Sequence, residues 1–153
     1  MNYSKALNEC IESAYMVAGH FGARYLESWH LLIAMSNHSY SVAGATLNDY
    51  PYEMDRLEEV ALELTETDYS QDETFTELPF SHRLEVLFAE AEYVASVVHA
   101  KVLGTEHVLY AILHDGNALA TRILERAGFS YEDKKDQVKI AALRRNLEER
   151  AGW

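Results

Sequence analysis

Apolar residues recur at helical spacing along most of the chain. In one segment they fall at i, i+4, i+7, i+8 and i+11, and a later segment repeats a similar spacing. The first set is Leu7, Ile11, Ala14, Tyr15 and Ala18, and the second is Leu84, Leu87, Phe88, Ala91 and Val94. No segment shows a convincing alternation of the kind that a half-buried strand needs. The pattern therefore predicts an all-α protein.

The same pattern of apolar residues occurs twice along the chain. When the sequence is shifted by 77 residues, positions 3–60 align with positions 80–137 without a gap, and twelve of the 58 pairs are identical. Apolar positions persist between the copies while surface positions differ, as expected where packing is shared. The sequence thus predicts two pseudo-symmetric repeats of four helices each.

Residues that favour helix starts support this division. Ser4 and Ser81 are expected to be the N-caps of the first helix in each repeat, and Ser28 and Thr105 those of the second. Third helices are expected at about 41–48 and 118–127, ended by Pro51 and Gly128, and fourth helices begin near Tyr52 and Ser130, the latter continuing through Ile140, Leu143 and Leu147.

The predicted domain organisation follows from these elements. Repeat 1 spans 1–64, an acidic and Thr-rich linker spans 65–79, and repeat 2 spans 80–149. Residues 150–153 are expected to begin a linker toward a further module outside this chain.

The net charge of the chain disfavours two classes of binding partner. The chain has 25 acidic and 13 basic residues, a formal net charge of −12, and a surface of that sign repels nucleic acid and anionic membranes. Residues 1–79 hold three bases against 14 acids, whereas 80–153 hold ten against 11. The acidic first half is either a set of solvated faces or a docking surface for a basic partner.

The sequence also bears on the location of the protein. No apolar stretch is long enough to cross a membrane. The chain has a single cysteine, Cys10, and its N-terminus does not resemble a signal peptide, so a cytoplasmic location is expected.

Catalytic motifs are missing from the sequence. It contains no P-loop, no HExxH, no CxxC and no GxSxG. His30 and His107 occupy the same repeat position beside apolar residues, which favours a hydrogen-bonded packing role over metal binding. Cys10 lies beside Glu9, which disfavours a thiolate, and a buried small apolar role is expected. No metal or cofactor is expected.

Residues 104–113, GTEHVLYAIL, followed by an acidic-Gly turn and by ALATRILERAG at 118–128, carry a family resemblance. They resemble the Clp N-terminal repeat, and the tandem copies resemble the N-domain of ClpC-type AAA+ unfoldases. The resemblance covers nearly the whole chain. Its motif is well kept in the second copy and degenerate in the first, where Glu27-Ser28-Trp29-His30 replaces Gly-Thr-Glu-His.

The resemblance implies a non-catalytic domain that receives substrates and adaptors of the MecA type. It presents them to its own AAA+ ring, which works with a ClpP-type peptidase. ATP is then expected only in ATPase modules outside this chain, and the isolated domain is expected to be a monomer.

The resemblance also implies a phosphoarginine pocket in the second repeat. Glu106 would meet the guanidinium, and the helix start at Thr105 would receive the phosphate. In the first repeat the counterparts are Ser28 and Trp29; Trp29 either stacks on a guanidinium or fills the core or a groove. One competent pocket is therefore expected. For adaptors, the expected surface is the acidic face of repeat 1 or a groove between the repeats, lined by Tyr25, Tyr40 or Phe75.

Other functions stay open at this stage. The chain could be the N-domain of a ClpB-type or ClpA-type relative, or a free-standing regulatory protein made only of Clp repeats. A helical enzyme with Glu106 and His107 as acid and base is disfavoured, because adjacent helical side chains diverge by about 100°.

Overall fold

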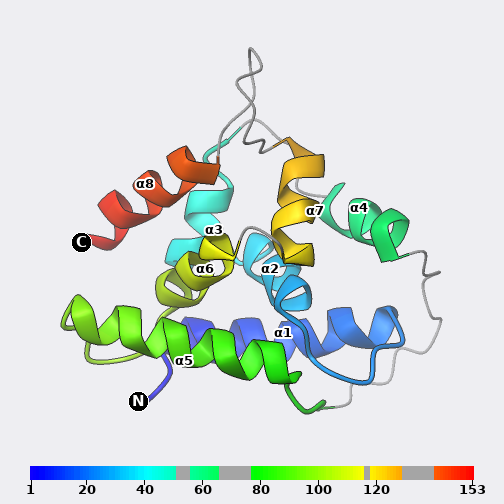
Figure 1. Ribbon diagram of the computed structural model, residues 1–153, viewed down its shortest axis with the longest axis horizontal. Helices are drawn as coiled ribbons and strands as arrows, with labels where there is room; N and C mark the ends of the chain where they lie inside the picture. Colours follow the sequence, from blue (N-terminus) through cyan, green and yellow to red (C-terminus); the bar gives the residue numbers. More distant parts are fainter. Residues whose placement is uncertain (51–55, 66–76, 116–117, 129–139) are drawn as a thin grey trace.

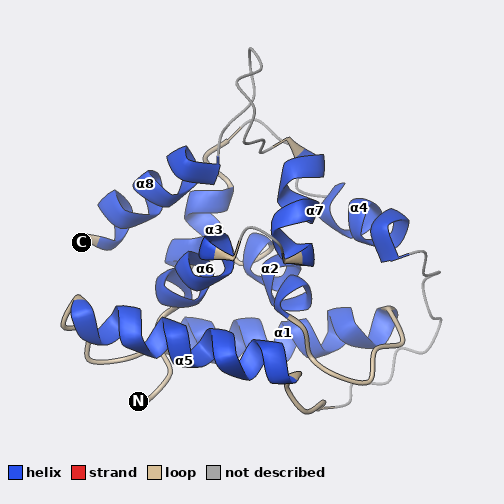
Figure 2. Ribbon diagram, viewed as in Figure 1, coloured by secondary structure: helices blue, strands red, loops and turns tan. Residues whose placement is uncertain are grey.

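The computed structural model describes residues 1–50, 56–65, 77–115, 118–128 and 140–153. Within these ranges the chain forms eight helices and no strand, as the apolar spacing predicts (Figures 1 and 2). The helices are α1 (Lys5–His20), α2 (Ser28–Ser36), α3 (Val42–Leu47), α4 (Arg56–Thr65), α5 (His82–Val97), α6 (Thr105–His114), α7 (Leu119–Ala127) and α8 (Ile140–Ala151).

The helix starts confirm part of the capping prediction. The Ser4 and Ser81 hydroxyls accept hydrogen bonds from the backbone N–H groups of Leu7 and Leu84, both at 3.1 Å. For the second helices the prediction was one residue late, because Glu27 and Gly104 are the N-caps of α2 and α6. Ser28 and Thr105 are instead the first residues of these helices.

The matched histidines explain this shift of one residue. The Nδ1 atom of His30 accepts a hydrogen bond from the Glu27 N–H at 2.9 Å, and that of His107 accepts one from the Gly104 N–H at 2.8 Å. Each ring thereby satisfies a backbone donor just before its helix, where no intrahelical acceptor exists. Both rings are buried, so the predicted hydrogen-bonded packing role is confirmed.

Other predicted boundaries hold in part. Gly128 ends α7 with a φ of 130°, a conformation that glycine adopts without steric cost. Ile140, Leu143 and Leu147 form the buried face of α8. Pro51, Tyr52, Ser130 and residues 66–76 of the predicted linker lie outside the described residues, while α4 continues to Thr65.

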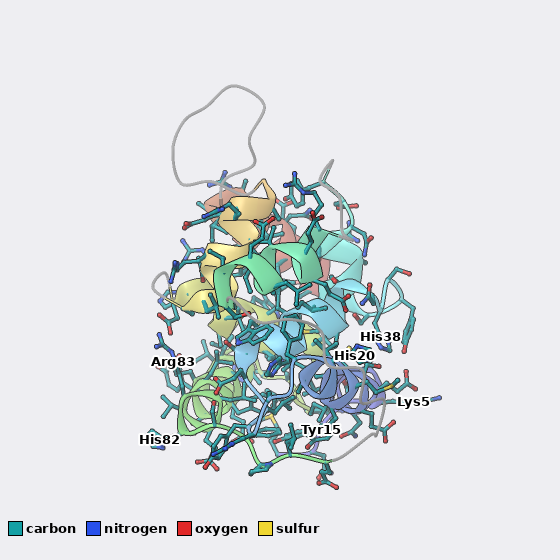
Figure 3. All side chains as sticks on the ribbon, turned by 90° about the vertical axis from the view of Figure 1, so that its right-hand side faces the viewer. Lys5, Tyr15, His20, His38, His82 and Arg83 are labelled. Atoms are coloured by element: carbon teal, nitrogen blue, oxygen red, sulfur yellow. The ribbon has the colours of Figure 1, made fainter. Side chains whose placement is uncertain are left out.

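The long first helices of the two repeats form the base of the molecule. In Figure 1 both run along the bottom of the view in opposite directions, and in the turned view of Figure 3 they lie side by side. α2 packs on α1 and α6 packs on α5, so each repeat begins with the same helix pair.

The repeats then interlock. α4 of repeat 1 packs against α7 of repeat 2, and α8 of repeat 2 packs against α3 of repeat 1. The N-terminal segments cross in the same way: Tyr3 pairs with Leu103, and its counterpart Phe80 pairs with Leu26. Because each repeat completes the other, buried apolar residues from both form one continuous core.

Polar contacts join α8 to Asp49 of repeat 1. Asn146 donates a hydrogen bond of 3.0 Å to the Asp49 carboxylate, which also forms an ion pair with Arg150. The Asn146 hydrogen bond is the main cause that lowers the pKa of Asp49. Arg150 and Ala151 are the last residues of α8, and Trp153 packs against His107 of α6.

The buried histidines predict a pH dependence of stability. Burial lowers the pKa of His30 to about 3 and also lowers that of His107. The unfolded chain therefore binds more protons than the native state below the usual pKa of about 6.5, so stability falls as pH drops from there toward 3. One such group accounts for at most about 1.4 kcal/mol per pH unit.

Urea unfolding of the wild type and of His30→Gln between pH 7 and pH 5 measures this contribution. We expect the variant to be less stable at pH 7 but to lose less stability on acidification. Equal losses on acidification in the two proteins would contradict the burial of a neutral His30.

Candidate functional site

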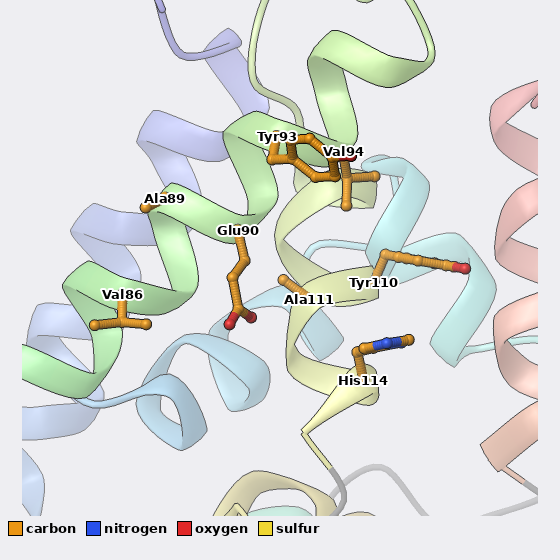
Figure 4. Close-up of a pocket in the computed structure, with 8 residues that line it drawn as sticks. All are labelled: Val86, Ala89, Glu90, Tyr93, Val94, Tyr110, Ala111 and His114. Atoms are coloured by element: carbon orange, nitrogen blue, oxygen red, sulfur yellow. The ribbon is translucent and has the colours of Figure 1, made fainter.

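An apolar groove lies on the outer face of repeat 2, between α5 and α6. Its volume is about 540 Å³, and Figure 4 shows the side chains around it. α5 contributes Val86, Ala89, Glu90, Tyr93 and Val94, and α6 contributes Tyr110, Ala111 and His114.

The sequence of α5 accounts for this groove. One face of the helix is buried in the core through Leu84, Leu87, Phe88, Ala91 and Ala95. The outer face carries a second apolar row, Val86, Tyr93 and Val97, which is 46%, 70% and 57% exposed. An amphipathic surface helix normally presents polar residues there. An exposed apolar row of this kind is typical of surfaces that bind other molecules.

On the α6 side of the groove, Tyr110 is positioned by contacts with α8 and with Trp153. The Tyr110 hydroxyl donates a hydrogen bond of 2.9 Å to Glu148, and burial together with this bond raises the pKa of Tyr110. Trp153 packs edge-on against Tyr110 with 5.2 Å between ring centroids, and stacks on His107 at 5.5 Å. The position of the groove wall thus depends on the last residues of the chain.

The equivalent surface of repeat 1 is polar. The α1 residues that correspond to Val86, Ala89 and Glu90 are Glu9, Glu12 and Ser13. The apolar row of α5 is therefore absent from α1. Only Met16, the counterpart of Tyr93, keeps an exposed apolar side chain at 53%.

A loop also covers this part of α1. The Ser13 hydroxyl lies 2.9 Å from Nε2 of His38, whose Nδ1 lies 2.6 Å from the Tyr40 hydroxyl. Tyr40 in turn donates a hydrogen bond to Glu9, which raises the pKa of Tyr40 to about 12. The two repeats share a fold, but the surface of α1 that corresponds to the apolar groove wall of α5 is polar and contacts this loop.

The two residues predicted to hold phosphoarginine take part in the packing of α6. Thr105 is buried, and its hydroxyl accepts a hydrogen bond of 3.2 Å from the Ala43 N–H at the start of α3. The Glu106 side chain is 18% exposed and folds back over Gly104. Burial raises the pKa of Glu106, and a hydrogen bond from its own backbone N–H opposes that shift.

The first-repeat counterparts are packed as well. Ser28 is buried, and Trp29 is partly buried against the core. The Trp29 ring meets Phe21 edge-on at 4.7 Å and lies 3.9 Å from the His30 ring. Trp29 thus packs against the core of repeat 1.

Family comparison agrees with this architecture. The family model of the Clp repeat (R) N-terminal domain matches residues 2–149. The chain belongs to the Clp N-terminal domain family. The match assigns almost the whole sequence to this regulatory domain and none of it to an ATPase module.

Solved Clp N-domains share the fold. The chain aligns with the N-terminal domain of ClpD from Arabidopsis thaliana at a TM-score of 0.75 and 18% identity, over 99% of this chain and 96% of that one. It aligns with the N-terminal domain of Hsp104 from Candida albicans at 0.73 and 16%, over 99% and 93%. A third match is a ClpV N-domain in complex with a VipB peptide, at 0.69 and 17%, over 99% and 88%.

Several sequence predictions can now be located on this Clp N-domain. Tyr25 and Tyr40 are exposed but do not line the α5/α6 groove, and Phe75 lies outside the described residues. Cys10 is buried, as predicted, and burial, with a smaller effect of Glu9, raises the pKa of its thiol to about 12.

The groove itself was not recognised from the sequence. The sequence does contain a signal for it: Val86, Tyr93 and Val97 recur at i, i+7 and i+11, on the face of α5 opposite its buried residues. The described residues contain no cluster of three or more His, Cys, Asp or Glu suited to a metal ion, and no helix among them has the length and apolar character to span a membrane.

Proposed function

We propose that this chain is the receiving domain of a Clp ATPase and that it captures apolar segments of substrates or adaptors in the α5/α6 groove. The observation that carries the proposal is the exposed apolar row of α5 beside Tyr110 and Ala111, in a protein that belongs to the Clp N-domain family. The peptide bound to the related ClpV N-domain supports the idea that this fold presents peptide sites.

The groove has the properties that a peptide site needs. Small side chains, Ala89 and Ala111, leave room for ligand atoms, and Tyr93 and Tyr110 provide aromatic walls. Aromatic residues lose little conformational entropy on binding and are enriched where proteins meet. The groove is also a concave apolar site with few polar groups, as expected for a site that accepts many sequences.

An array of 13-residue peptides tiled from unfolded proteins tests this function. We expect the purified chain to bind peptides rich in Leu, Ile, Phe and Val and to ignore polar ones. Binding that follows peptide charge without regard to apolar content would overturn the proposal.

The narrower assignment rests on the sequence resemblance. We propose that the parent protein is of the ClpC type, receives substrates through a MecA-type adaptor and delivers them to a ClpP-type peptidase. The support is the Gly104-Thr105-Glu106-His107 start of α6. ClpB-type and ClpA-type relatives, and a free-standing Clp-repeat protein, are the alternatives that sequencing of the gene beyond Trp153 distinguishes.

Phosphoarginine recognition through Glu106 belongs to this narrower proposal. Its support is a carboxylate beside the N-terminus of α6, where backbone N–H groups favour an anion. Because the Glu106 carboxylate folds over Gly104, ligand binding requires that this side chain swing outward. We therefore expect weak binding at a single site.

Calorimetric titration with free phosphoarginine measures this binding. We expect about one equivalent to bind to the wild type and to Trp29→Ala, none to Glu106→Ala, and unmodified arginine not to bind. Two equivalents, or binding that survives in Glu106→Ala, would contradict the assignment.

A further inference from the structure

We propose that Glu90 makes the α5/α6 groove selective for apolar segments that carry a lysine or arginine side chain. This inference rests on the proposed function, because it names the class of segment that the groove admits. The evidence is the position of one carboxylate within an otherwise apolar lining.

Glu90 stands at the centre of the exposed row of α5. It is one turn after Val86 and one turn before Tyr93, and all three line the groove. Figure 4 shows the Glu90 side chain extending from α5 into the space beside α6. Among the described residues, no ion pair or hydrogen bond engages its carboxylate; the nearby Arg83 on α5 pairs with Asp115.

A ligand that fills the groove changes the surroundings of this carboxylate. Apolar ligand atoms displace the water that solvates it, and a desolvated charge without a partner is costly. A ligand ammonium or guanidinium replaces the lost hydration with charge-assisted hydrogen bonds. A ligand carboxylate in the same place adds repulsion to the desolvation cost.

Two further features favour a cation at this position. The exposed Tyr93 ring, one turn away, can also accept a cation on its face. The net charge of −12, most of which lies in residues 1–79, speeds the encounter of basic segments with the domain as a whole. At the far side of the groove, Arg144 contacts His114 at 3.3 Å, and the Glu148 carboxylate already accepts a hydrogen bond from Tyr110. Glu90 is therefore the lining carboxylate that a ligand cation would meet.

The first repeat lacks this arrangement. Ser13 occupies the position of Glu90, and its hydroxyl contacts His38. Selectivity for a basic residue is therefore a property of the α5/α6 groove and not of the repeat fold.

The test uses one strongly binding apolar peptide from the array, made in three forms that differ at one central position as Lys, Gln or Glu. Fluorescence anisotropy at 150 mM salt gives the three affinities. For the wild type we expect the Lys form to bind at least fivefold more tightly than the Gln form, and the Glu form to bind most weakly.

Two variants on α5 separate a local effect from net charge. Glu90→Gln is expected to bring the three affinities within about twofold while it keeps binding of the Gln form. Glu85→Gln removes the same charge from an exposed position outside the groove and is expected to behave as the wild type. Equal affinities for the three forms in the wild type, or an unchanged preference in Glu90→Gln, would overturn the inference. Failure of every peptide to bind would instead overturn the proposed function.

Discussion

Gly44→Ala is expected to lower the stability of the domain by about 3 kcal/mol, which corresponds to a drop in Tm of roughly 6–12 °C for a chain of this size. A Cβ atom on Gly44 would lie 1.9 Å from the carbonyl oxygen of His38 and 2.6 Å from that of Met35. Both obstacles are backbone atoms, so no side-chain rotation relieves the clash. The gain in helix propensity from Gly to Ala, about 0.5–1 kcal/mol, is too small to compensate.

Thermal unfolding followed by circular dichroism measures the effect. Ala45→Ser, at the next and partly exposed position of α3, is the control and is expected to change stability by less than about 1 kcal/mol. A Gly44→Ala protein as stable as the wild type would contradict the close approach of the His38 carbonyl to α3.

The same position differs between the repeats in an informative way. The counterpart of Gly44 is Thr121, whose hydroxyl donates a hydrogen bond of 2.7 Å to the carbonyl of Asp115. Asp115 is the counterpart of His38. In repeat 1 the missing side chain lets the loop approach α3 closely, and this is the loop whose His38 and Tyr40 contact α1.

The second large effect concerns the groove. Tyr93→Glu is expected to weaken binding of an apolar peptide from the array by at least tenfold. It removes an aromatic wall that is 70% exposed, and it places a second carboxylate one turn from Glu90. Because the side chain is largely exposed, the fold is expected to tolerate the change.

The repeat provides a matched control for this substitution. Met16 occupies the equivalent position on α1 and is 53% exposed. Met16→Glu therefore makes the same change of charge on the same kind of helix, and we expect it to alter peptide affinity by less than twofold. Equal losses in the two variants, measured by fluorescence anisotropy, would indicate a general charge effect and would contradict a site on α5.

The sequence alone was sufficient to predict the all-helical fold and its internal repeat. The apolar rows of α1 and α5 and the caps Ser4 and Ser81 are local signals, and they predicted the elements correctly. The interlocking of the repeats was not predictable in this way. Spacing shows which face of α4 or α8 is apolar but not which neighbour covers it.

The candidate sites also depend on contacts that local sequence patterns do not reveal. The motif at Glu106 suggested a residue ready to bind a ligand, whereas its carboxylate lies over Gly104, a contact that depends on side-chain conformation. The caps of α2 and α6 were misplaced by one residue because histidine is an unusual partner for an N-cap backbone N–H. The groove depends on the outward row of α5, which becomes meaningful only once the inner row is known to be buried.

The most direct test of the central claim is an NMR titration of the ¹⁵N-labelled 153-residue chain with one strongly binding apolar peptide. We predict that the largest amide shift changes fall on α5 and α6, around Ala89, Tyr93 and Ala111. The corresponding amides of repeat 1, Glu12, Met16 and Ala34, are predicted to stay unchanged. Changes centred on α1, or spread equally over both repeats, would contradict the conclusion that the α5/α6 groove is the receiving site.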